Sequence, residues 1–425
     1  MTRSLFLVAV LWALVGIPSG TAQDAPVAFV GATVHPVSGP VIQNGTVVVH
    51  EGRITYVGGA QGAPLNGARQ IDATGKVIMP GIVDTHSHVG QGDGGDSSNP
   101  IQPDVRILDT LDPRADSFNK ARSGGITTVN VMPGSGHLMS GQTAYLKLRQ
   151  ANTIEEMLVC DDPMTDVCGG MKMANGTNSM RGSGGFPGTR ARSAALQREI
   201  FYEARAYQKK LADGDTTRNL RMEPLVEILD GRRIVHWHTH RHDDILTALR
   251  IAREFGFTPV LHHVSEGWRV ADEIAAAGAP ASIIALDSPG GKLEARGLIF
   301  RTGAALEAAG VRTAYHTDDP IVDSRFFLRE AALGVRAGMS REAAIESLTL
   351  AGAEMLGLAD RVGSLGVGKD ADLLVLTGDP LSIYTHVEQT WVDGEKVFDY
   401  NDAEDRPYAE GGFDVYRNSV THVHD

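Results

Sequence analysis

The chain has 425 residues, a formal net charge of −13 and 42% hydrophobic residues, a composition typical of a soluble globular protein. This length allows one large domain and a smaller one. The acidic balance repels phosphates and no basic stripe is present, so a nucleic-acid partner is not expected.

The first 22 residues have the pattern of a signal peptide. Arg3 supplies the positive charge, Leu5–Ile17 form the apolar stretch, and small residues precede a cleavage point after Ala22. We therefore expect a periplasmic or secreted protein with no stable membrane insertion after cleavage. The alternative is an uncleaved membrane anchor, but the apolar run is shorter than the roughly 20 residues that a spanning helix needs.

The chain contains two cysteines, Cys160 and Cys168. In an exported protein they can form a disulfide. Two unpaired thiols are the alternative, and the sequence leaves the choice open because it does not give the Cα separation that a disulfide requires.

Short β-rich runs with turn residues between them occupy residues 23–77, at 27–30, 45–49 and 53–57. They predict the first part of a small β domain. From residue 78 to 358, β-branched runs alternate with amphipathic helical patterns. The predicted strands include 126–131, 233–238, 258–263, 282–286 and 311–316, and the predicted helices include 244–255, 269–277 and 303–309. This alternation indicates an α/β fold with a (β/α)8 TIM barrel.

Strand patterns return after the last barrel helix. Ser340 is a predicted N-cap for a helix that runs to about Leu356. Residues 359–400 then predict the second part of the small domain, a β-sandwich built from both chain ends. Residues 401–425 form a polar tail that we expect to be loosely packed.

The most informative segment runs from Pro80 to His88. Alternate residues of a strand share a face, so His86 and His88 can direct two imidazoles at one point. An apolar strand that ends in polar residues is typical of the catalytic face of a barrel. Two imidazoles at this spacing suit Zn²⁺ or a similar divalent metal.

Three later strand ends carry further candidate ligands. His238 ends one strand, and either His262 or His263 ends the next, because neighbouring strand residues face opposite ways. Asp318 follows the last strand and is the candidate general base, whereas Asp319 is better suited to a turn. The spare histidines are expected to pack or to donate hydrogen bonds to other side chains, and they include His236, His242 and His316.

Several segments together resemble the amidohydrolase superfamily, and in particular its imidazolonepropionase-related members. The segments that carry the resemblance are Pro80–His88, Gly124–Val129, His238–Ile245, His263–Gly267, Thr317–Pro320 and Arg361–Leu373. The resemblance covers nearly all of residues 25–398 and implies a barrel with its active site at the mouth.

The resemblance also implies a set of site residues. The metal ligands that it implies are His86, His88, His238, His263 and Asp318, with Asp318 also acting as the base. Many superfamily members add a carboxylated lysine that bridges two metals, and Lys172 is the candidate. A surface or salt-bridged lysine is the alternative reading, so the resemblance implies one or two divalent ions, with zinc the expected metal.

Two segments bear on the pocket. Close relatives have a glutamate in a Gly-Glu-Asn triplet, where this chain has Gly176-Thr177-Asn178. The segment Lys292–Glu294 also matches the family, either as a substrate contact or, the reading we favour, as a solvated charge pair.

The sequence thus predicts an exported metal-dependent hydrolase of carbon–nitrogen bonds, acting on an amide, a cyclic amide or a small peptide through metal-activated water. A deaminase of a heterocyclic base is the alternative enzyme. Such enzymes place a glutamate three residues after a metal-binding histidine. Glu266 lies three residues after His263, which agrees with this pattern, whereas the residue three after His238 is Arg241, which does not. A non-catalytic metal-binding export protein is a third reading. A small-molecule substrate is the expected partner, and the sequence leaves open whether a homo-oligomer forms.

Overall fold

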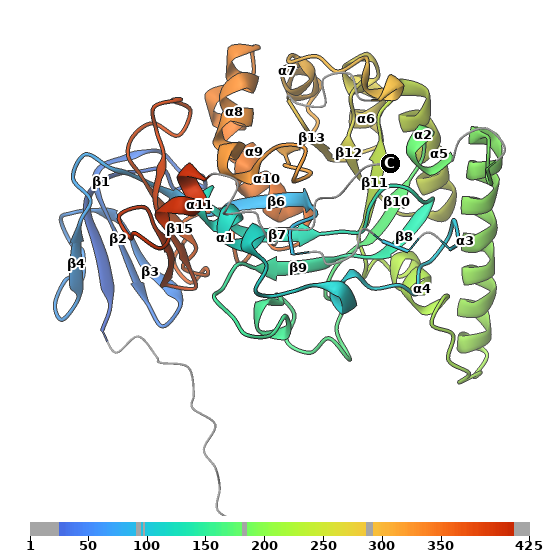
Figure 1. Cartoon of the computed structure of the whole chain (residues 1–425), viewed down its shortest axis with the longest axis horizontal. Helices are drawn as coiled ribbons and strands as arrows, with labels where there is room; N and C mark the ends of the chain where they lie inside the picture. The colour runs from blue at the N-terminus through green and yellow to red at the C-terminus, as the bar shows by residue number, and fades with distance from the viewer. Residues whose placement is uncertain (1–24, 91–94, 97, 181–184, 286–291, 412–425) are drawn as a thin grey trace, which may run out of the picture.

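The computed structural model describes residues 25–90, 95–96, 98–180, 185–285 and 292–411 (Figure 1). No helix in these ranges combines the length and apolar character that a membrane crossing requires. The predicted signal peptide, residues 1–22, lies outside the described residues.

Both ends of the described chain contribute strands to one sheet, which Figure 1 shows as neighbouring blue and red arrows. Its eight strands are β1 (Val27–Val34), β2 (Ile42–His50), β3 (Arg53–Gly59), β4 (Arg69–Asp72), β5 (Val77–Pro80), β15 (Leu373–Leu376), β16 (Val387–Val392) and β17 (Glu395–Asp399). Their order is β17-β16-β15-β5-β1-β2-β3, with β4 paired to β1. The sheet extends to Pro80, past the boundary expected at residue 77.

Strand β1 is central because its first half pairs with β4 and its second half with β5. The pairing of β1 with β2 shifts register around Gly31, whose φ of +85° breaks the extended conformation. The described strands are hydrogen-bonded into one continuous sheet, and β1 is shared between its two parts. The β-sandwich stays a prediction. The core of the sheet includes Phe29, whose ring meets Trp391 edge-on at 5.1 Å between centroids.

The second body alternates strands and helices, as predicted for residues 78–358. Its parallel strands are β6 (Ile82–Ser87), β7 (Ile126–Val131), β10 (Met171–Ala174), β11 (Val235–Thr239), β12 (Val260–His263), β13 (Ala281–Ile283) and β14 (Thr313–Tyr315). They fall into two hydrogen-bonded sheets, ordered β14-β13-β12-β11-β10-β8 and β6-β7-β9. The strands β8 (Met139–Gln142) and β9 (Ala144–Lys147) are antiparallel to their neighbours.

Helices and short 3₁₀ turns connect these strands, and the last helix follows β17. The helices are α1 (Asp116–Ser123), α2 (Thr177–Met180), α3 (Arg190–Ala212), α4 (Glu223–Leu229), α5 (His242–Phe255), α6 (Ala271–Ala276), α7 (Thr302–Ala308), α8 (Phe327–Arg336), α9 (Arg341–Leu348), α10 (Leu350–Met355) and α11 (Arg406–Glu410). The 3₁₀ turns are η1 (Ile107–Thr110), η2 (Glu155–Met157), η3 (Gly267–Arg269), η4 (Leu293–Ala295) and η5 (Ser324–Phe326).

The helix predicted from Ser340 to about Leu356 is divided. Ser340 caps α9 as expected, because its hydroxyl accepts the Ala343 N–H. Thr349 then leaves the helical conformation, with φ −133° and ψ −93°, and separates α9 from α10. The break lets α10 pack closely on β6, where a Cβ at Gly352 would lie 2.8 Å from the Val83 carbonyl oxygen.

The C-terminal tail, which was predicted to pack loosely, is described as far as residue 411, and its helix α11 has no buried side chain. Helix α11 lies beside α1 (Figure 1). The Tyr408 carbonyl accepts a hydrogen bond from the Ser123 hydroxyl, and the Tyr408 hydroxyl donates to Asp116 at 3.1 Å. These polar contacts join α11 to α1. Residues 412–425 lie outside the described range.

A single residue, Gly81, joins strand β5 of the small sheet to strand β6 of the second body. A Cβ there would lie 2.1 Å from the Thr127 hydroxyl, so only glycine allows the approach. The Gly81 N–H donates to the Asp372 carbonyl at 3.0 Å. Gly81 thus holds the start of β6 close to Asp372 of the small sheet and to Thr127 of β7.

A buried cation, Lys147 at the end of β9, also joins the two bodies. Its side chain is 1% exposed and pairs with Asp370 and Asp372, each at 2.8 Å, and with Asp393. All three aspartates come from the C-terminal part of the small sheet and its turns. The coulombic effect of these carboxylates outweighs burial and raises the pKa of Lys147, so the lysine stays charged.

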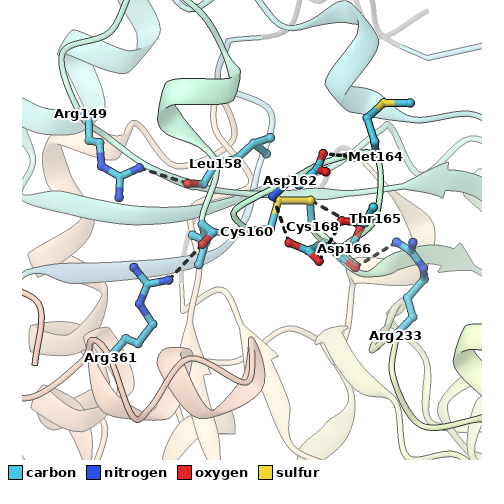
Figure 2. Close-up of a disulfide and its surroundings, with 12 residues drawn as sticks. Arg149, Leu158, Cys160, Asp162, Met164, Thr165, Asp166, Cys168, Arg233 and Arg361 are labelled. Atoms are coloured by element: carbon cyan, nitrogen blue, oxygen red, sulfur yellow. Dashed lines mark hydrogen bonds between the residues drawn. A yellow bond between two sulfur atoms is a disulfide. The ribbon is translucent and has the colours of Figure 1, made fainter. Parts of the chain in front are cut away.

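Cys160 and Cys168 form a disulfide with a Cα–Cα separation of 5.2 Å (Figure 2). Three arginine side chains donate hydrogen bonds to main-chain carbonyls on either side of it: Arg149 to Leu158, Arg361 to Val159, and Arg233 to Gly169. Of the two readings that the sequence left open, the structure has the disulfide.

We predict that Lys147→Met lowers the free energy of unfolding by about 3–5 kcal/mol, because Asp372 would stay buried without its ion-pair partner. Urea denaturation followed by tryptophan fluorescence measures the effect. The control is Arg341→Met, which removes a half-exposed pair with Asp379 and should cost less than about 1 kcal/mol. Equal losses in the two variants would contradict a structural role for the buried cluster.

Candidate metal centre

The first cluster of site residues lies where β6 and β14 end. Asp318 Oδ1 is 2.9 Å from His88 Nε2 and 3.2 Å from His86 Nε2, and Oδ2 is 4.0 Å from His263 Nδ1. Burial alone raises the pKa of Asp318, but the imidazoles of His86, His88 and His263 hold it well below its usual range. The carboxylate is therefore ionised and available to a cation.

The carboxylate of Asp84 fixes the position of this cluster. It accepts hydrogen bonds from the Thr317 hydroxyl at 2.5 Å, the Thr317 N–H at 3.1 Å and the His86 N–H at 3.2 Å. The Asp318 N–H donates to the His86 carbonyl at 2.8 Å. These bonds connect β6 to the segment after β14. Strands β6 and β14 belong to different sheets and share no ladder hydrogen bonds.

Lys172 on β10 is fully buried and contacts the first cluster. Its Nζ lies 3.1 Å from His86 Nε2 and 2.9 Å from Met132 Sδ. Burial lowers its pKa to about 7, which makes the neutral amine accessible near neutral pH. The alternative of a surface lysine is wrong, because the β10 strand carries the side chain into the core.

A second cluster lies at the ends of β11 and β12. The ring centroids of His238 and His263 are 4.4 Å apart, and those of His240 and His263 are 4.8 Å apart. Burial lowers the pKa of His238 to about 4 and that of His240 well below its usual value. The imidazoles are thus neutral at pH 7, the form in which histidine binds metals.

Glu294 is a site residue that the favoured sequence reading missed. The expected solvated charge pair is wrong for this residue, because its side chain is 1% exposed and faces His238 and His240. Its Oε2 accepts the Thr177 N–H at 2.6 Å, so the triplet that departs from the family pattern holds this carboxylate. The match of Lys292–Glu294 to a family segment was the signal that could have identified it.

His262 and His263 were expected to face opposite sides of their strand, and this expectation is wrong. Both rings lie near that of His86, with centroids 5.0 and 4.9 Å away. His263 has a φ of +72°, so the chain leaves the extended conformation at this residue and strand alternation no longer applies. Residue type alone gives no signal for such a conformation.

The other histidines make hydrogen bonds within the protein. His236 Nε2 lies 2.8 Å from the Tyr145 hydroxyl, and its Nδ1 lies 2.9 Å from His262 Nε2. His316 Nδ1 lies 2.7 Å from the Ser282 hydroxyl. His242 is exposed and pairs with Glu266 at 2.6 Å.

Asp319, expected in a turn, accepts hydrogen bonds from Lys120 Nζ at 2.8 Å and from the Ser324 N–H at 2.9 Å. These contacts leave Asp319 outside the first cluster and hold the segment after Asp318 against α1 and η5.

The residues fit a divalent metal. Three groups have their ligand atoms within 4.8 Å of one another: His86, His262 and His316; His238, His240 and His263; and His86, His263 and Asp318. The buried atoms His240 Nε2 and His263 Nε2 have no hydrogen-bond partner among the described residues. Such a donor set of neutral imidazoles and carboxylate is the one that zinc and similar metals prefer.

A family model described as the amidohydrolase family matches residues 204–398 of the chain. The chain is also similar to the crystal structure of an amidohydrolase from Thermotoga maritima MSB8. The two share 34% identity with a TM-score of 0.81, over 88% of this chain and 100% of that one. This likeness implies a TIM-barrel-type fold with a small extra domain.

Curated relatives point the same way. Amidohydrolase tasK of Hapsidospora irregularis is 28% identical over 87% of this chain, which spans only 42% of its length. An imidazolonepropionase of Bacteroides thetaiotaomicron is 25% identical over 80% of this chain and 86% of its own. A 5-methylthioadenosine/S-adenosylhomocysteine deaminase of Symbiobacterium thermophilum is 56% identical, but over only 14% of each chain.

We predict that Zn²⁺ stabilises chelator-treated protein, because it neutralises the repulsion among buried ring nitrogens and binds the folded form alone. At a free concentration of 1,000 times Kd the free energy of unfolding should rise by about 4 kcal/mol. Thermal denaturation with and without metal measures this. Mg²⁺, which prefers oxygen ligands, should stabilise less, and an unchanged Tm with Zn²⁺ would contradict a metal centre here.

Proposed function

Because the chain belongs to the amidohydrolase family, we propose that it hydrolyses a carbon–nitrogen bond in an amide, a cyclic amide or a small peptide. The observation that carries the proposal is the Asp318 carboxylate, within 3.2 Å of His86 and His88 at the ends of β6 and β14. We also propose that the two sheets of the second body close into a barrel with this site at its mouth.

The proposed roles follow from the positions of the side chains. The residues that would hold metal are His86, His88, Lys172, His238, His263 and Asp318. A bound divalent metal, zinc in our proposal, supplies Lewis acidity, which lowers the pKa of water and polarises a carbonyl. Asp318 accepts the proton of the attacking water and delivers it to the leaving nitrogen. The bonds through Asp84 keep that carboxylate in place during both transfers.

A deaminase remains the second candidate, favoured by the short stretch of high identity to the Symbiobacterium deaminase. The position of Glu266 supports the amide reading instead. Although Glu266 lies three residues after His263, its carboxylate pairs with the exposed His242, and the Glu266 side chain lies against Gly297. The partners of its carboxylate are therefore His242 and Arg269, which belong to neither cluster.

A substrate panel separates these two activities. We expect release of a carboxylate from amides, lactams or dipeptides, and no release of ammonia from adenine, guanine or their nucleosides. Coupled detection of ammonia, together with mass spectrometry of the products, measures both. Ammonia release from a nucleobase, with no amide cleaved, would contradict the amide hydrolase and support the deaminase.

We predict that Asp318→Asn lowers kcat by at least about 100-fold, because an amide does not accept the proton of water. Metal analysis should show that the variant retains bound metal, which separates loss of the base from loss of the ion. Asp319→Asn serves as the control, since Asp319 contacts Lys120 and Ser324 outside the clusters. Undiminished turnover in Asp318→Asn would support a non-catalytic metal-binding protein.

We further propose export to the periplasm or the medium. The disulfide between Cys160 and Cys168 supports this, because such bonds persist in oxidising compartments. The protein recovered from the periplasm or medium should begin at Gln23 or Asp24. Intact mass spectrometry tests this, and a full-length, reduced protein in the cytoplasm would contradict it.

A further inference from the structure

A chain of hydrogen bonds runs through the core from strand β9 to strand β12. The hydroxyl of Tyr145 on β9 lies 2.8 Å from His236 Nε2, and Nδ1 of the same ring lies 2.9 Å from His262 Nε2. His236 and His262 are fully buried, and Tyr145 is 7% exposed. Because β9 and β11 belong to different sheets, the bond between Tyr145 and His236 joins the two sheets of the second body.

The inner end of this chain contacts the metal centre. The ring of His262 meets the ring of His86 edge-on, with 5.0 Å between their centroids. His86 directs its Nε2 at Asp318, 3.2 Å away. A tilt of the His262 ring would therefore displace a proposed metal ligand, because a closely packed interior transmits small movements.

The outer end of the chain is held by the segment that the disulfide between Cys160 and Cys168 closes (Figure 2). The Tyr145 N–H donates to the Cys168 carbonyl at 2.9 Å, and the Tyr145 carbonyl accepts the Val159 N–H at 3.0 Å. Val159 directly precedes Cys160, so both ends of the closed segment bind the main chain of Tyr145. The tyrosine thus presents its hydroxyl to His236 from an anchored position.

The main chain also leaves room for the ring of His236. A Cβ at Gly170 would lie 2.3 Å from His236 Cδ2 and 2.7 Å from Nε2, the atom that the tyrosine hydroxyl contacts. A side chain at residue 170 would therefore push the ring away from Tyr145. This close approach indicates that the fold specifies the position of His236.

We propose that Tyr145 and His236 are positioning residues for the metal centre. A neutral imidazole carries one N–H, so the two linked rings stay bonded only when their protons are placed in step. The chain thereby fixes the orientation of His262 and, through it, that of His86. Metal-binding histidines are characteristically oriented by hydrogen-bonded groups behind them. The inference rests on the proposed function, because His86 is a ligand of the metal centre assigned there.

Zinc affinity tests the proposal without any substrate. The purified full chain is stripped with a chelator, and Zn²⁺ is titrated back in competition with a coloured chelator. We expect Tyr145→Phe to weaken zinc binding by about tenfold and His236→Leu by about 10–100-fold. His236→Asn, whose amide can still meet His262, should lose less than His236→Leu. Adding Tyr145→Phe to His236→Leu should cause no further loss, because the chain is already broken.

The matched control is Tyr315→Phe. It removes another buried hydroxyl, which contacts Met339 Sδ at 3.6 Å and lies outside the chain. This variant should keep the zinc affinity of the unaltered protein. Circular dichroism confirms that each variant is folded, and zinc-saturated Tyr145→Phe should show a lower kcat at an unchanged KM, because a displaced ligand affects the transition state more than the binding of substrate.

Two outcomes would overturn the positioning role. One is an unchanged zinc affinity in folded His236→Leu, and the other is a loss in Tyr315→Phe equal to that in Tyr145→Phe. If zinc affinity falls only in the variants of the chain while the unaltered protein cleaves no amide, the proposed function is contradicted and the positioning role stands.

Discussion

The carboxylate of Asp84 makes the contact on which the site depends. It is fully buried and bonds to the segment after β14 through Thr317 and to its own strand through His86. Burial raises the pKa of Asp84 to about 7 despite these hydrogen bonds, so the environment disfavours its charge. The carboxylate accepts hydrogen bonds from Thr317 after β14 and from His86 on β6, two strands that are not paired in a sheet. This contact brings Asp318 close to the histidines of β6.

Around this contact the protein buries several neutral imidazoles at close range. Such a core is poor in apolar packing, and several of its ring nitrogens have no hydrogen-bond partner within the described part of the chain. The arrangement becomes reasonable when cations occupy the gaps, because a cation attracts the lone pairs that otherwise repel one another. A polar interior of this composition is what a metal centre requires, and the main apolar cluster contains none of these histidines.

Much of this was accessible from the sequence, since strand periodicity and turn residues depend on local chemistry. Several predicted ligands lie at or just after strand ends, namely His86, His88, His238 and Asp318, and parallel strands bring such ends together. The sequence did not predict that the rings of both His262 and His263 lie near the ring of His86. This arrangement depends on the positive φ of His263, which the residue type does not indicate. Glu294 was missed because its burial results from tertiary contact with Thr177, which lies far away in sequence.

The junction at Gly81 limits how the enzyme can move. The strand of the small sheet runs into β6 across one residue, and Lys147 is embedded among aspartates of the other body. A hinge needs a few residues that can change conformation freely, and this junction has none to spare. Rotation of one body against the other would pull His86 and His88 off their target. We therefore expect the two bodies to keep their relative orientation while substrate enters and product leaves.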